Sequence, residues 1–283
     1  VYMSYLENID GQHRFFLKSD INAFNSYRYL IDNEIKNTQV EFFNLSFEKL
    51  MERMAQVEGF YKSLLETPFD FSIKDEINLD FKKASYANNL IELRAIWRKR
   101  LKLNALERFT SKKDEEAQKL KKDVTYVMKT DNELEEKARE IISENMDAFF
   151  ERYNDLNRKN WFSIYINSIV LQFDPHTSYL APSEKDRFDA SMSGEFEGIG
   201  ARLQKRNQEV KIVEVISGGP VWRDELLEIG DIILKVAQPN KEAVDISGMR
   251  LDDSIKLIKG PKGTQVILTI KRVDGAIEDV KVT

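Results

Sequence analysis

Apolar residues in the first two thirds of the chain recur at the spacing of an α-helix. Between Leu45 and Leu65 they fall three or four residues apart, and Leu90–Leu106 repeats this pattern. Thr130–Leu156 begins with the spacing of a capping box and continues as a long amphipathic helix. Trp161–Phe173 is mostly apolar, which is typical of a central helix. We therefore expect residues 1–188 to form an all-helical N-terminal domain.

Three other segments of this half carry weaker patterns. Ser19 and Asp20 are typical N-cap residues, and they precede a helix expected over Ile21–Lys36. Phe69–Lys83 spaces its apolar residues by polar ones, which favours an irregular segment or a short pair of strands. Lys112–Asp123 is dense in charges of both signs, and we interpret it as the solvated face of a helix.

The pattern changes to alternation after residue 188. Strands are predicted at Val210–Ile216, Asp231–Val236, Thr264–Arg272 and Ile277–Val282, with helices at Val221–Leu227 and Met249–Lys259. Leu251, Ile255 and Ile258 lie on one face of the second helix. The fold class is therefore multidomain, α then α+β, with the second domain at residues 189–283.

A glycine turn precedes the strands of the second domain. Gly198 and Gly200 flank Ile199, and glycine allows backbone angles that direct successive N–H groups to one side. The N–H groups around Gly198, Ile199, Gly200 and Ala201 are therefore predicted to bind an anion, and a side chain at Gly200 is expected to close this nest. The strand that follows should be a free edge, so the favoured ligand is the C-terminal carboxylate and backbone of another polypeptide. The groove residues are Arg202 and Leu203 on the strand and Leu251, Ile255 and Ile258 on the helix.

Composition narrows the class of partner. The net charge is −5 and basic residues alternate with acidic ones, which argues against a nucleic-acid partner. The chain has no cysteine, so it has no thiol nucleophile or Cys-based metal site, and no metal or cofactor is expected. No apolar run is long enough to span a membrane. Val1–Leu6 has the pattern of a helix already under way, and we expect both ends to belong to a longer protein.

Asp174–Leu180 (DPHTSYL) joins the two halves. His176 beside hydroxyls and an aspartate could belong to a nucleophilic site. However, Asp-Pro initiates turns, Thr177 and Ser178 can act as caps, and no nucleophile-elbow motif surrounds either hydroxyl. The favoured interpretation is a structural turn, and we expect no catalytic residue here.

The order of elements after Gly198 resembles a PDZ domain, here a β-sandwich or partial barrel with two helices. Four motifs resemble the PDZ domain of the C-terminal processing peptidases: Phe196–Ala201 (FEGIGA), Gly218–Pro220 (GGP), Gly230–Ile233 (GDII) and Leu257–Gly263 (LIKGPKG). Asp174–Leu180 matches the same family. Looser matches extend the resemblance over the N-terminal half, to the helical domain of the tail-specific proteases, the larger branch of the family. They are Ile9–Asp10, Phe16–Asp20, Pro68–Phe71 and the Trp97 helix.

The resemblance implies a periplasmic serine peptidase of a Gram-negative bacterium, associated with the membrane in its full-length form, that binds apolar C-termini of proteins for processing or degradation. The family's Ser nucleophile and Lys base lie in a peptidase domain after the PDZ domain, and no position here matches their motif. The chain is thus expected to be a recognition and regulatory part, inactive by itself. Implied partners are substrate C-termini, the peptidase domain of the same full-length chain and, as a further candidate, an adaptor lipoprotein.

Two alternatives from other classes remain open. One is a free-standing PDZ adaptor or scaffold without protease activity, which a reading frame ending close to Thr283 would favour. The other is a small hydrolase that uses His176, which a peptidase assay on the chain would detect.

Overall fold

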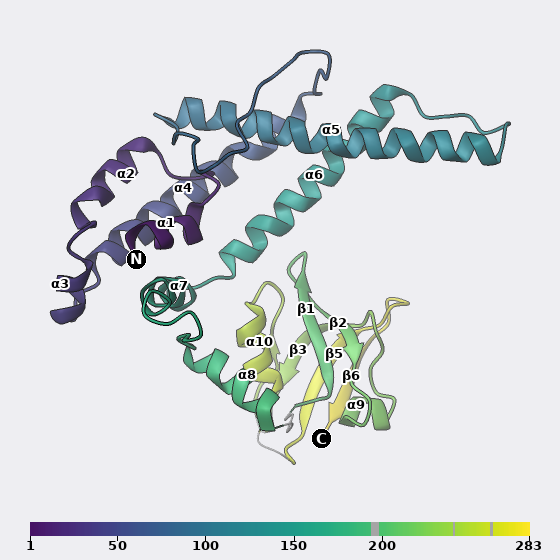
Figure 1. Ribbon diagram of the computed structural model, residues 1–283. Coiled ribbons are helices and arrows are strands. Elements are labelled where there is room, and N and C mark those ends of the chain that lie inside the picture. The colour runs from purple at the N-terminus through teal and green to yellow at the C-terminus, as the bar shows by residue number, and fades with distance from the viewer. Residues whose placement is uncertain (194–197, 240, 261–262) are drawn as a thin grey trace. The chain divides into compact units, whose positions relative to one another are not determined.

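The computed structural model describes residues 1–193, 198–239, 241–260 and 263–283, which form two compact units (Figure 1). The first unit is Val1–Ala181 and the second is Pro182–Thr283. Parts of two sequence motifs, residues 196–197 and 261–262, lie outside the described residues. The expected order, a helical domain followed by an α+β domain, is confirmed.

The first unit is built from helices of very different length. They are α1 (Tyr2–Asp10), α2 (Lys18–Phe24), the 3-10 helix η1 (Asn25–Tyr27), α3 (Ile31–Lys36), α4 (Glu41–Glu66), α5 (Leu90–Lys122), α6 (Asp131–Asn154) and α7 (Arg158–Val170). The last three begin at residues whose side chains accept a backbone N–H of the first turn: Asn89, Thr130 and Asn157. Thr130 and Asn157 are part of full capping boxes, so the sequence defines where these helices start.

The core of this unit is rich in aromatic rings. Phe42 and Phe43 of α4 are fully buried, and both contact the ring of Tyr165 of α7, Phe42 edge-on and Phe43 at a tilt. A buried ion pair fixes α2 to α4, because the Arg53 guanidinium donates to both carboxylate oxygens of Asp20 at 2.8 Å. The exposed fractions of the two side chains are 10% and 4%.

Two helices of this unit differ from the sequence expectation. The single helix predicted over Ile21–Lys36 is wrong, because the chain leaves α2 after Phe24 and enters a 3-10 turn. There the Ser26 hydroxyl donates to the Ala23 carbonyl at 2.9 Å, a local bond that competes with the helix. The helix predicted to end at Leu106 continues to Lys122 through the charge-dense segment. Phe69–Lys83 contains turns and no strand.

Over its described residues, the second unit is an antiparallel sheet with three helices. Its elements are α8 (Pro182–Ser193), β1 (Ala201–Arg206), β2 (Glu209–Val215), α9 (Pro220–Arg223), β3 (Ile232–Ala237), β4 (Val244–Asp245), α10 (Leu251–Ile258), β5 (Val266–Lys271) and β6 (Ile277–Val282). The strand order is β1-β2-β3-β5-β6, with β4 paired to β3. β1 and β6 are therefore the two edges of the main path of the sheet.

Successive side chains of a strand point to opposite faces of the sheet, and this explains which residues of these strands are buried. Ile212, Leu268 and Ile270 are fully buried and belong to one apolar cluster, which Val221 of α9 also joins. α9 is shorter than the helix predicted over Val221–Leu227, because Glu225 adopts a left-handed φ of +50° that ends it. No glycine marks this position, so the sequence gives no stop signal.

Candidate functional site

The glycine loop is fixed to the core of the second unit by its carbonyls and by one side chain. The Ile199 carbonyl accepts from the Val221 N–H at 3.2 Å, and the Gly200 carbonyl accepts from the Ile216 N–H at 2.8 Å. The Ile199 side chain is only 6% exposed. Gly198 and Gly200 have φ of +143° and +82°, a region that side chains disfavour. The loop is therefore a rigid turn whose conformation needs both glycines.

Gly200 also makes a close approach to a second glycine. A Cβ placed on Gly200 would lie 2.9 Å from the Gly219 Cα, and one on Gly219 would lie 2.8 Å from the Gly200 Cα. This corrects the expectation for Gly200. The sequence suggested that an added side chain would close the nest. In the structure the side chain would instead meet the backbone before α9 and disrupt the loop. The Gly218–Pro220 motif therefore contacts the glycine loop, which its resemblance to the family motif alone did not indicate.

The first residue of β1 presents its backbone to the free edge. Ala201 of β1 lies opposite Val215 of β2. The preceding residue, Gly200, lies opposite Ile216, whose N–H donates to the Gly200 carbonyl. Because hydrogen-bonded positions alternate along an antiparallel pair, the N–H and C=O of Ala201 point away from β2. They are therefore available to an added strand.

The residues around the predicted groove differ in burial. Ala201 and Leu203 of β1 are half-buried against the apolar cluster, as is Leu251 of α10. Ile255 is also half-buried but is not part of that cluster's packing, whereas Ile258 is only 3% exposed and belongs to the core. Ile258 can therefore form only the floor of a groove.

Arg202 points to the other face of β1. It alternates with Ala201 and Leu203, is exposed, and pairs with Glu214 of β2 at 2.8 Å. Its side chain therefore lies on the face away from Ala201 and Leu203, and its backbone faces β2, because hydrogen-bonded positions alternate along the pair.

Hydrogen bonds fix the two ends of α10 to different parts of the sheet, the turn after β1 and the end of β3. Before the helix, the Gly248 N–H donates to the carbonyl of Gln208, in the turn between β1 and β2, at 2.8 Å. At the other end, the Gln238 amide donates to the Leu257 carbonyl. Within the helix the buried Ser254 hydroxyl bonds the Arg250 carbonyl at 3.1 Å. The start of α10 is therefore fixed to the turn after β1, and its end is fixed to the end of β3.

Most charges on α10 are paired within the helix. Lys256 donates to Asp253 at 2.8 Å, and Arg250 lies 3.9 Å from the same carboxylate. The hydrogen bond from Lys256 outweighs partial burial and holds the pKa of Asp253 below its ordinary value. The carboxylate is therefore ionised at neutral pH and neutralises its neighbours, so the first turns of α10 add little net charge to the groove.

The His176 segment is a hydrogen-bonded turn. The carboxylate of Asp174 accepts from the His176 N–H at 2.9 Å and from the Thr177 hydroxyl at 2.9 Å. The pKa of Asp174 lies below its ordinary value because of these bonds. The side chain of His176 is 90% exposed. The hydroxyl that could act as a nucleophile is thus directed at the aspartate, which fits the structural interpretation.

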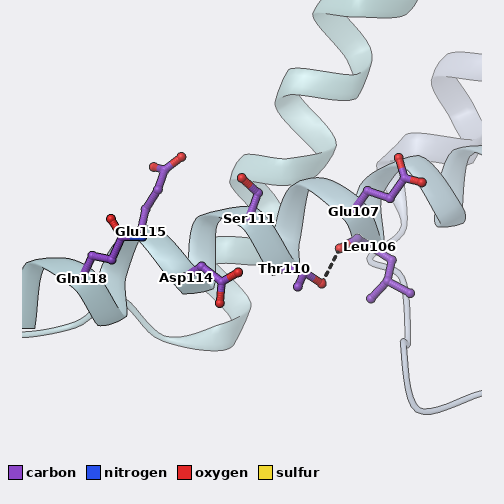
Figure 2. A pocket seen from close by; sticks show the side chains of 7 residues that line it. All are labelled: Leu106, Glu107, Thr110, Ser111, Asp114, Glu115 and Gln118. Carbon is purple, nitrogen blue, oxygen red and sulfur yellow. Dashed lines mark hydrogen bonds between the residues drawn. The ribbon is translucent and has the colours of Figure 1, made fainter.

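A shallow hollow on α5 carries no comparable geometry. Figure 2 shows that residues of this one helix line it, among them Glu107, Asp114 and Glu115, and that the Thr110 hydroxyl bonds the Leu106 carbonyl at 2.9 Å. One wall of exposed side chains cannot enclose a ligand. In the described part of the chain no group of three metal-ligating side chains comes together. Likewise, none of the described helices has the length and apolarity to cross a membrane.

Two protein-family models match the chain. Residues 1–183 match the tail specific protease N-terminal domain, and residues 189–271 match the PDZ domain. The sequence is 28% identical to the tail-specific protease of Haemophilus influenzae. The alignment covers 97% of this chain and 37% of that protein. It is also 37% identical to a carboxy-terminal-processing protease of Bartonella bacilliformis. That alignment covers 38% of this chain and 23% of that protein.

A solved structure is also similar to part of the chain. It is the PDZ domain of a carboxy-terminal protease from Vibrio cholerae in complex with a peptide, 39% identical, with a TM-score of 0.30. The match covers 31% of this chain and 91% of that one. The chain thus spans well under half the length of the full-length relatives it matches.

Proposed function

The chain belongs to the tail-specific protease family, and from this we propose that it is the substrate-recognition and regulatory part of a periplasmic serine endopeptidase. The proposal has two components. One is the binding of apolar protein C-termini by the second unit, which carries the PDZ domain. The other is hydrolysis by a peptidase domain of the same full-length protein, with the family's Ser and Lys beyond residue 283.

One observation carries the binding component: a rigid glycine loop opens onto a free strand edge with an apolar helix beside it. In the proposed complex, the terminal carboxylate accepts hydrogen bonds from the N–H groups at Ile199 and Gly200. The peptide backbone pairs with the N–H and C=O of Ala201, as an added strand. The side chain of the last peptide residue then lies between β1 and the apolar face of α10, which carries the half-buried Leu251 and Ile255.

The wider setting rests on the family. The relatives are named proteases, which supports a proteolytic role for the full-length protein. We assign this chain no hydrolysis of its own, because no position matches the family's Ser and Lys motif and the Thr177 hydroxyl beside His176 donates to Asp174. Periplasmic location, association with the membrane, and an adaptor lipoprotein as partner belong to the same proposal. They follow from the family resemblance alone.

The test compares two forms of one peptide. An apolar peptide with a free C-terminus should bind the chain, and its C-terminal amide should bind much more weakly. Charge-assisted hydrogen bonds contribute about 1.5–3 kcal/mol, so the expected loss is at least about tenfold. Isothermal titration calorimetry with both peptides measures it. Equal affinity for acid and amide would refute carboxylate recognition by the glycine loop.

A further inference from the structure

We propose that the free end of the hairpin formed by α5 and α6 is a membrane-contacting tip. Its exposed valines enter the interface of a bilayer, and its lysines bind the anionic headgroups of the lipids. The tip comprises residues 119–127. This inference rests on the part of the proposed function that places the full-length protein at a membrane, and it names the residues of the helical unit that make the contact.

The tip is the outermost part of the hairpin. α5 continues to Lys122, whereas α6 begins at Asp131, whose carboxylate pairs with Lys113 of α5 at 2.8 Å. The end of α5 therefore extends past the start of α6 by the length of residues 114–122, roughly 13 Å in a helix. Figure 1 shows this end projecting beyond α6, with the connecting segment running back along it. The acidic first turn of α6 thus lies behind the tip.

Hydrogen bonds give the tip a fixed conformation. The buried Glu116 carboxylate of α5 accepts from the Tyr126 hydroxyl at 2.7 Å and from the Lys129 N–H at 3.1 Å. The carboxylate of Asp123 accepts from the N–H of Thr125 at 2.9 Å. The segment that follows α5 is therefore tied back onto the helix, and the fold sets which of its side chains face outward.

Two valines of this fixed segment face outward. Val124 and Val127 are 88% and 86% exposed, more than any other large apolar side chain in the described part of the chain. Leu120, on the last turn of α5, is 38% exposed. Apolar side chains that are exposed together on a rigid segment mark a surface that interacts with another molecule or with a membrane. The tip is such a surface, because its own fold makes no use of these valines.

The charges of the tip match an anionic membrane. Residues 117–130 contain four lysines and one aspartate, a net charge of +3, although the whole chain has a net charge of −5. Lys119 pairs with Glu116, whereas no carboxylate of the described residues binds the ammonium of Lys121 or Lys122. Long basic side chains of this kind keep their charge among the headgroups while apolar neighbours enter the acyl boundary.

A protein matches the same surface less well. A specific protein interface takes about 20–30 residues a side, which is more than the end of one hairpin presents. A second copy of this chain would bring the lysines of two tips together, and like charges oppose such a contact. A membrane needs no complementary shape, and its anionic lipids attract each lysine that lies near the surface.

The apolar contact is tested by co-sedimentation of the whole chain with vesicles made of equal parts of phosphatidylcholine and phosphatidylglycerol. The double variant Val124→Asn, Val127→Asn should lower the partition coefficient about tenfold, because its side chains no longer favour the apolar boundary. The control Val273→Asn replaces a valine of the second unit that is 70% exposed, and it should bind as the native chain does. Equal losses in this control and in the double variant would overturn the inference.

The lysines are tested on the same vesicles. Lys121→Ala combined with Lys122→Ala should weaken binding about fivefold for each lysine. The matched control, Lys82→Ala combined with Lys83→Ala, also removes two neighbouring exposed lysines, but from the segment before α5, and it should have no effect. Binding of the native chain should fall at high ionic strength and on vesicles of phosphatidylcholine alone. Equal binding to both kinds of vesicle would contradict the contribution of the lysines.

A fluorescent label locates the contact. The chain has no cysteine, so Val124→Cys can carry a single environment-sensitive fluorophore. Its emission should shift to the blue with anionic vesicles, and the same label on Val273→Cys should not respond. A native chain that fails to bind these vesicles, or a label at the tip that stays in water, would overturn this inference. Calorimetry with the apolar peptide tests recognition of C-termini separately, and the tip variants should leave that affinity unchanged.

Discussion

Replacing Gly200 by alanine should destabilise the second unit through two separable effects. The first is backbone strain, because alanine at a φ of +82° costs about 1–2 kcal/mol. The second is steric, because the new Cβ would lie 2.9 Å from the Gly219 Cα and 3.2 Å from the Pro220 Cδ. Overpacking of this kind costs about 1–3 kcal/mol. Together, Gly200→Ala should lower the free energy of unfolding by about 2–5 kcal/mol.

Two neighbouring glycines separate these effects. Gly218 has nearly the same φ, +83°, and open space within 4 Å of an added Cβ, so Gly218→Ala should report strain alone. Gly219 has an ordinary φ of −73°, but its Cβ would lie 2.8 Å from the Gly200 Cα, so Gly219→Ala should report the clash alone. The loss in Gly200→Ala should then be close to the sum of the other two.

Hydrogen exchange followed by mass spectrometry can measure these losses in one unit at a time. Peptides from β3 and β5 contain the buried Ile233 and Ile270 and exchange only when this unit opens. Peptides from α4 serve as the internal control, because the helical unit should not respond. If Gly200→Ala falls within about 0.5 kcal/mol of Gly218→Ala, the close approach is relieved at no cost and the explanation of the loop is refuted.

Two further predictions concern the groove and the helical core. A peptide ending in leucine should outbind one ending in alanine by about 2 kcal/mol in competition assays, since each buried methylene contributes roughly 0.8 kcal/mol, and Ala201→Phe should reverse this order; preference of the native chain for alanine would contradict an open pocket beside Ala201. Arg53→Met should destabilise the helical unit by about 3 kcal/mol in urea unfolding, because it leaves the buried Asp20 carboxylate without its cationic partner. Burial alone would raise the pKa of Asp20, but hydrogen bonds from Arg53 and Leu17 hold it below its ordinary value. The ion pair therefore stabilises the fold above the unfolded pKa of about 3.9 and loses this effect as pH falls through the folded pKa, so the deficit of Arg53→Met should shrink in acid; a deficit independent of pH would contradict this assignment.

The sequence predicts much of the fold because many of its local signals agree with the tertiary structure. The capping box at Thr130 marks the start of α6, and alternation after Glu209 marks β2. At Ser26 and Glu225 the local signals are insufficient. A hydroxyl bond to Ala23 ends one helix within a pattern that continues, and a left-handed glutamate ends another without any glycine. Such choices between nearly equal local conformations are made by the surrounding packing.

For the site, the sequence indicates the residue types but not their contacts. The glycine turn and the strand after it follow from Gly198, Gly200 and the alternation of Ala201 and Leu203. The contact between Gly200 and Gly219 does not follow, because it joins two turns that are distant in the chain.

The open edge of β1 creates a risk of self-association that this strand counters by itself. An unpaired edge that accepts a peptide could equally accept the same strand of another copy and begin an aggregate. Three cations, Arg202, Lys205 and Arg206, line β1, so two copies side by side would bring like charges together. A bulge in the pairing at Arg202 and Leu203 adds twist, which shortens the flat stretch that a long partner needs. The edge is therefore suited to the short chain end of the proposed complex, and its charges and twist oppose growth into a fibre.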